Sequence, residues 1–114
     1  MTKEKDTLRL TASEEQVMLR LWELGQATVT DLLALYPEPK PAYNTVSTLI
    51  RILERKKIVR HKPKGRGYIY TPKISKETYR DELAKHLITK YFDNNTEAVL
   101  SYYNKTKTLD DLLK

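Results

Sequence analysis

Residues 41–72 read PAYNTVSTLIRILERKKIVRHKPKGRGYIYTP, and this stretch decides the fold. Its first half repeats apolar residues at helical spacing, at Ala42, Val46, Leu49, Ile50 and Leu53. The spacing predicts a helix from Pro41 to about Lys56. Pro41 suits the first helical position, where the missing backbone N–H costs nothing.

The second half of the stretch is rich in β-branched and aromatic residues on both sides of a glycine-bearing turn. Residues 58–62 and 68–71 have this composition, which favours strands, and residues 64–67 read KGRG between them. The pattern predicts a β-hairpin whose tip is basic.

Two shorter helices are predicted upstream. Thr11 and Glu14 have the spacing of a capping box, and the apolar stripe that follows ends at Gly25. A second helix is expected from near Thr28. It must end by Tyr36, because prolines follow at 37, 39 and 41.

The rest of the chain predicts a helical tail. Ser75 is placed to cap a fourth helix, residues 93–95 (DNN) break it, and a fifth helix and a short final one follow. The apolar and aromatic side chains of the tail exceed what one small core needs, so we expect them to form a homodimer interface. We assign to it Tyr79, Leu83, Leu87, Tyr91, Phe92, Leu100 and Tyr103.

These elements together predict a mainly α fold with a small β-hairpin. The order is that of a winged helix-turn-helix, which we assign to residues 1–73, followed by a helical dimerisation region over residues 74–114. In such folds one helix enters the major groove of double-stranded DNA, and the preceding helix braces it across the backbone.

The charge distribution favours a polyanionic partner. The chain carries a net charge of +6, and residues 40–80 hold twelve basic residues against two acidic ones. The remainder is therefore mildly acidic. This basic third contains the predicted helix and hairpin that would meet DNA.

The polar face of the third helix carries the candidate DNA contacts. Short polar side chains stand towards its N-terminus, where they can reach base edges, and arginines stand towards its C-terminus. The candidates on the helix are Asn44, Thr45, Ser47, Thr48, Arg51 and Arg55. From the hairpin we add Lys64 as a phosphate contact and Arg66, which either contacts the phosphate backbone or enters a minor groove.

Other function classes find little support in the sequence. There is no cysteine, the two histidines lie in different predicted elements, and no nucleophile–base pair or carboxylate cluster is visible. We therefore expect neither an enzyme nor a cofactor or metal site. Without a signal peptide or an apolar run of membrane-spanning length, we expect a cytoplasmic protein with no membrane insertion.

Three segments resemble one known family. Residues 10–25 (LTASEEQVMLRLWELG), 29–37 (VTDLLALYP) and 41–72 look like the BlaI/MecI/CopY-type penicillinase repressors, in the family's order and spacing. The resemblance implies a dimeric transcriptional repressor that binds inverted-repeat operators. It also adds Tyr43 to the base-reading residues of the third helix, and it places the wing at residues 64–67.

The resemblance further implies a mode of regulation. Relatives that control β-lactam resistance are inactivated by cleavage in the tail, triggered by a membrane-bound sensor protease. The family's Asn-Phe cleavage pair falls at Ser101 and Tyr102 here. Other departures are Asn44, where the family often has Thr, and Lys57, which replaces a usual glycine and is therefore expected to be left-handed.

One alternative of another class stays open at this point. The same winged helix is compatible with a protein-interaction module that binds DNA weakly and without sequence preference. A preference for a palindromic duplex over a scrambled one separates the two hypotheses.

Overall fold

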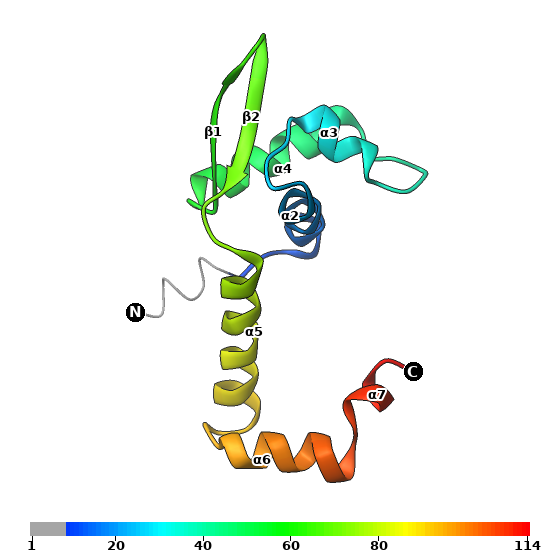
Figure 1. The fold of residues 1–114 in the computed structure, drawn as a ribbon, viewed down its shortest axis with the longest axis vertical. Coiled ribbons are helices and arrows are strands. Elements are labelled where there is room, and N and C mark those ends of the chain that lie inside the picture. The colour runs from blue at the N-terminus through cyan, green and yellow to red at the C-terminus, as the bar shows by residue number, and fades with distance from the viewer. Residues whose placement is uncertain (1–8) are drawn as a thin grey trace. The chain divides into compact units, whose positions relative to one another are not determined.

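The computed structural model describes residues 9–114, and it divides into two compact units after Tyr79 (Figure 1). The first unit holds helices α2 (Ala12–Leu24), α3 (Val29–Ala34) and α4 (Tyr43–Arg55), strands β1 (Val59–Lys64) and β2 (Gly67–Pro72), and the start of α5 (Lys76–Tyr91). The second holds the rest of α5, then α6 (Thr96–Ser101), the π-helix η1 (Tyr102–Thr106) and α7 (Leu109–Leu112). The expected mainly α fold, with one hairpin and a helical tail, is confirmed.

The predicted cap of the first helix is present, and the second helix has a cap of the same kind. Thr11 Oγ1 accepts from the Glu14 amide at 3.1 Å, and the Thr11 amide donates to the Glu14 carboxylate at 2.9 Å. Thr28 and Asp31 form the same reciprocal pair on α3. Gly25 ends α2 at φ 84°, a backbone conformation that a Cβ would disfavour.

Helix α4 begins later than the sequence pattern predicts. The pattern makes Pro41 its first residue, but Ala42 is the N-cap with an extended backbone, and Tyr43 is the first helical residue. Pro41 thus stands just before the N-cap rather than at the first helical position. At the other end Lys57 has φ 67°, so the expected left-handed lysine is confirmed.

Strands β1 and β2 form the predicted antiparallel hairpin, with His61 opposite Tyr70 and Pro63 opposite Tyr68. Both strands run further towards the tip than expected, so that Lys64 pairs with Gly67 across a two-residue turn. Ala27 adds a bridge to the base of the hairpin through two backbone hydrogen bonds with Tyr70, of 3.0 and 2.8 Å.

The hydrophobic core lies in the first unit. It draws residues from α2, α3, α4 and the base of the hairpin, and its largest fully buried side chains are Val17, Met18, Leu21, Leu32, Val46, Ile50, Leu53, Ile58 and Val59. Three buried residues come from one face of α4, so the orientation of that helix is set by the core.

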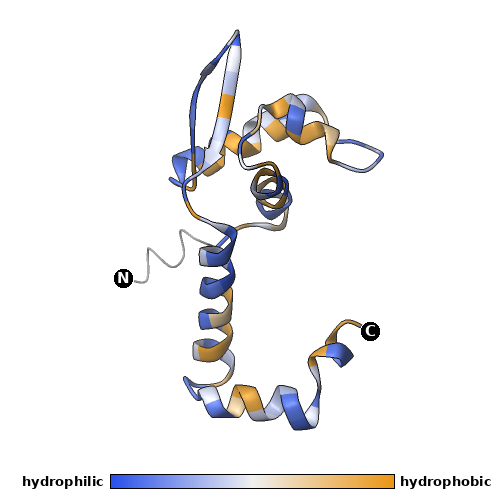
Figure 2. Ribbon diagram, in the orientation of Figure 1, coloured by the Kyte–Doolittle hydropathy of each residue, from blue (hydrophilic) through white to orange (hydrophobic). Residues whose placement is uncertain are grey.

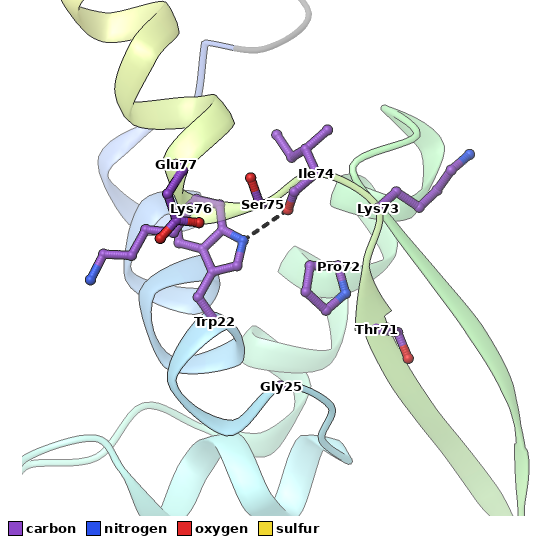
Figure 3. Close-up of a pocket in the computed structure, with 9 residues that line it drawn as sticks. All are labelled: Trp22, Gly25, Thr71, Pro72, Lys73, Ile74, Ser75, Lys76 and Glu77. Atoms are coloured by element: carbon purple, nitrogen blue, oxygen red, sulfur yellow. Dashed lines mark hydrogen bonds between the residues drawn. The ribbon is translucent and has the colours of Figure 1, made fainter.

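The start of α5 is anchored to the first unit by Trp22. The indole Nε1 of Trp22 donates to the carbonyl of Ile74 at 3.0 Å, at the edge of a shallow open pocket (Figure 3). The Tyr79 ring packs against Trp22 at a centroid distance of 5.8 Å, and the Leu10 amide donates to its hydroxyl at 3.3 Å. The first compact unit therefore includes Ile74 and the first residues of α5.

The second unit has helices but no buried core of its own. Residues 80–114 include no side chain in the buried class, although Figure 2 shows hydrophobic residues along α5, α6 and α7. The predicted break between α5 and α6 is present, with Asp93 and Asn94 both at positive φ. Asn95 then caps α6 by accepting from the Ala98 amide at 2.9 Å.

Candidate nucleic-acid interface

Helix α4 presents its predicted contact residues to solvent. Tyr43 is 53% exposed, and Asn44, Thr45, Thr48, Arg51 and Arg55 are exposed as well. Ser47 is half-buried, and its carbonyl accepts from Arg51 Nε at 3.4 Å. The structure thus brings eight of the nine candidates to exposed positions, counting the two of the wing described below.

The charge along α4 is graded. Its first turn carries no acidic residue, and the partial positive charge of a helix N-terminus lies there. Arg51 and Arg55 follow towards the C-terminus. Phosphate oxygens suit the N-terminus and the two arginine side chains, while the short polar side chains between them can reach base edges.

The tip of the wing is basic and exposed. Lys64 and Arg66 both lie in the exposed class, and Arg60 and Lys62 add two further cations on β1. The tip turn contains Gly65 at φ 60°, a conformation that favours glycine. Long cationic side chains on an exposed hairpin are suited to phosphate contact.

The two wing tyrosines have different environments, which the sequence alone does not distinguish. Tyr70 is 5% exposed and belongs to the core, whereas Tyr68 is 51% exposed. Burial raises the pKa of the Tyr70 phenol, and the Glu54 carboxylate adds to that increase. Tyr70 is therefore a neutral structural residue, and Tyr68 is the tyrosine available at the surface.

Two contacts that were not predicted from the sequence hold the loop between α3 and α4. Lys40 Nζ donates to the carbonyls of Leu33, Ala34 and Tyr36, which closes the end of α3. The Arg20 guanidinium lies 3.9 Å from the centroid of the Tyr36 ring. A basic residue within reach of a helix C-terminus is the only sequence signal for the first contact.

A third missed contact joins α4 to the wing. The Glu54 carboxylate contacts Nδ1 of His61, and the His61 ring packs edge-on against Tyr68 at 4.6 Å between centroids. No periodic pattern links these residues, because the turn at Lys57 and the start of β1 separate them.

The residues expected at a dimer interface are divided between the units. Tyr79 is buried in the first unit against Trp22, so its own chain already accounts for its apolar surface. Leu83, Tyr91 and Leu100 are 41%, 71% and 72% exposed. Leu87, Phe92 and Tyr103 are half-buried, with Phe92 and Tyr103 in ring contact at 5.9 Å.

The predicted cleavage pair lies within continuous helical structure. Ser101 is the last residue of α6, and Tyr102 is the first of η1; both are exposed. Tyr102 also packs edge-on against Tyr103, with ring centroids 4.9 Å apart.

Residues 9–114 contain neither a metal-binding cluster nor a membrane-spanning helix. Among them, no group of three or more His, Cys, Asp or Glu side chains could hold a metal ion. No helix in this part of the chain is long and apolar enough to cross a membrane.

Comparison with known proteins matches this geometry to a family. The sequence model of the penicillinase repressor family covers residues 10–113, which includes every described helix and strand. The chain belongs to the penicillinase repressor family. The resemblance inferred from the three sequence segments is therefore confirmed, and the family is one of transcriptional repressors rather than of enzymes.

One curated relative is an uncharacterized 16.5 kDa protein of Latilactobacillus sakei, described by its location in the ptsI 3′ region. It is 33% identical to this family member over 89 residues, which are 73% of this chain and 60% of that protein. The matched region thus spans less than two thirds of the relative's length.

Proposed function

We propose that this chain is a sequence-specific transcriptional repressor that binds inverted-repeat operators as a homodimer. In this proposal α4 enters the major groove, where Tyr43, Asn44 and Thr48 read base edges. The observation that carries the proposal is the division of α4 into two faces. One face is buried in the core through Val46 and Ile50, and the other is exposed and bears almost only polar and cationic side chains.

The remaining candidates are assigned as follows. Thr45, Ser47 and Arg51 join the base-reading face, Arg55 contacts phosphate, and the wing contacts the adjacent backbone through Lys64 and Arg66. The basic, exposed character of the wing supports this assignment. The DNA-binding module then comprises the first compact unit, which runs to Tyr79 rather than to residue 73.

In this proposal the helical tail forms the dimer interface. Leu83, Tyr91 and Leu100 are exposed, and no side chain of residues 80–114 is in the buried class. Both observations support an apolar surface that a second copy of the chain covers. A two-fold dimer presents two copies of α4 to DNA, and such an arrangement recognises an inverted repeat.

Relief of repression by a membrane-bound sensor protease remains part of the proposal only through family resemblance. Ser101 and Tyr102 differ from the family's Asn-Phe pair, and their backbone is helical. Cleavage between them would require this turn to unwind, because proteases bind their substrates in extended form. Incubation of the full chain with the sensor protease, followed by mass spectrometry, tests this step.

The experiment that tests the DNA-binding function is a selection of bound sequences from random duplex DNA at near-physiological salt. We expect an inverted repeat from the full-length protein. A variant with Asn44→Ala and Thr48→Ala serves as control, because it retains every cation but lacks two of the side chains proposed to read bases. Recovery of no motif from the folded wild-type protein would instead support the weakly binding interaction module.

A further inference from the structure

The contact between Glu54 and His61 joins the proposed recognition helix directly to the wing. Glu54 lies in the last turn of α4, and its carboxylate meets Nδ1 of His61 on β1. The two side chains are 30% and 37% exposed, so the pair is partly shielded from solvent. A hydrogen bond to an ionised carboxylate is stronger than one between two neutral groups.

His61 sits where the wing leaves the body of the first unit. It pairs with Tyr70 across the hairpin, and its ring contacts both Tyr70, at 5.8 Å, and Tyr68, at 4.6 Å. Beyond it, residues 62–68 are all exposed. Among the described residues, no side-chain hydrogen bond or ion pair joins that outer segment to α4.

Apart from the contact with His61, the negative charge of Glu54 is unfavourable for DNA binding at this position. It lies on the helix that carries Arg51 and Arg55, next to a basic wing, where a polyanion is proposed to bind. If charge alone decided affinity, removal of this carboxylate would strengthen binding to DNA. We therefore look for a contribution of Glu54 to DNA binding that outweighs its repulsion of the phosphates.

We propose that Glu54 and His61 form a positioning pair that fixes the angle between the wing and α4, so that both engage one duplex at the same time. This inference rests on the proposed DNA-binding function. Neither residue touches DNA in this arrangement. The pair instead holds the inner face of the hairpin, and through it the directions of Lys64 and Arg66.

The test compares full-length Glu54→Gln with Glu38→Gln. Both changes remove one negative charge, but Glu38 is an exposed residue of the loop before α4, away from the wing in sequence. Fluorescence anisotropy with the selected operator, at constant ionic strength, is expected to show binding about fivefold weaker for Glu54→Gln. Glu38→Gln is expected to bind as tightly as the wild type or slightly more tightly.

A second pair of variants separates coupling from general damage. The double variant is expected to bind as weakly as Glu54→Gln, because the carboxylate–imidazole contact is already lost in the single variant. His61→Gln, which keeps the repulsive Glu54 carboxylate, is expected to bind at least as weakly. Hydrogen exchange of the free proteins is expected to be faster at the amides of residues 61–70 in the variants and unchanged in α2. Equal or tighter operator binding by Glu54→Gln overturns the inference while the repressor function stands. A wild type that selects no DNA overturns the proposed function and the inference together.

Discussion

The ammonium of Lys56 lies 2.9 Å from both carboxylate oxygens of Glu14, and it joins the end of α4 to the first turn of α2. The Glu14 side chain is only 5% exposed, and it also accepts from the Thr11 amide. One carboxylate thus caps α2 and holds the last turn of the proposed recognition helix.

Removal of the lysine is expected to destabilise the first unit. Lys56→Met leaves the buried Glu14 carboxylate with the Thr11 contacts alone, which should lower the free energy of unfolding by about 1–3 kcal/mol. Urea denaturation at pH 7 measures the change. Lys73→Met, at an exposed position of the same unit, is the control and should shift stability by less than about 0.5 kcal/mol. Equal effects of the two substitutions would mean that the Glu14 pair contributes nothing.

The same carboxylate predicts a loss of stability in acid. Burial by itself would raise the pKa of Glu14, but the Thr11 hydrogen bonds and the Lys56 ammonium outweigh it, and the pKa lies below the usual 4.5. The stabilisation is therefore complete above pH 4.5 and declines as the pH falls through the lowered value. Thermal melts of the wild type and Glu14→Gln between pH 3 and pH 7 should converge towards the acidic end. A constant difference in melting temperature over that range would contradict the prediction.

A second local feature, the left-handed Lys57, predicts a stabilising substitution. The Ile58 amide donates to the Leu53 carbonyl at 3.0 Å and the Lys57 amide to Glu54 at 2.9 Å, which is the pattern of a helix end that glycine normally occupies. Lys57→Gly should raise the free energy of unfolding by about 1 kcal/mol, because glycine adopts positive φ without a steric penalty. Urea denaturation checks the value, and Lys57→Ala, which keeps the Cβ, should show no gain.

The sequence could predict these local features because their causes are local. A capping box and a glycine at a helix end each involve residues within four positions of one another, whereas the left-handed Lys57 is expected from the family resemblance. The helical face of Val46, Ile50 and Leu53 is likewise a short-range pattern, and all three are fully buried. The predicted start of α4 is too early because a proline can stand either in the first turn or before the cap.

Contacts between distant residues could not be predicted in the same way. Lys56 and Glu14 are 42 positions apart, and Trp22 and Ile74 are 52 apart. The periodic pattern of apolar residues in a sequence does not show which partner a buried polar atom contacts once the core has assembled. Tyr79 shows the consequence: its helical spacing with Leu83 suggests one continuous interface, although its ring packs against Trp22.

The dimer proposal predicts the effect of a single charged residue in the tail. Leu100 is 72% exposed on α6, and Leu100→Asp should weaken association of the full-length chain by at least tenfold, because a carboxylate would have to lose its water at the interface. Sedimentation velocity over a range of concentrations measures the shift from dimer to monomer.

A point substitution is preferred to truncation at residue 73, which would remove Ile74 and Tyr79 from the first unit. Tyr79→Phe is the matched control: it removes the acceptor for the Leu10 amide and should lower stability while leaving association unchanged. A dimer unaffected by Leu100→Asp but weakened by Tyr79→Phe would move the interface away from the exposed tail.

The proposed roles of α4 in base reading and of the wing in phosphate contact predict two kinds of DNA-binding defect. Arg66→Ala should weaken binding to operator and random duplex alike, and it should reduce the slope of log affinity against log salt by about 1 for each phosphate that the protein no longer neutralises. Asn44→Ala should instead lower discrimination at one base position in each half-site by about 1–3 kcal/mol, with the salt slope unchanged. Anisotropy titrations at several salt concentrations, on both duplexes, separate the two effects. Equal losses of affinity on both duplexes for both variants would remove the distinction between base-reading and phosphate-binding residues, because only a contact with a base edge can depend on the sequence it meets.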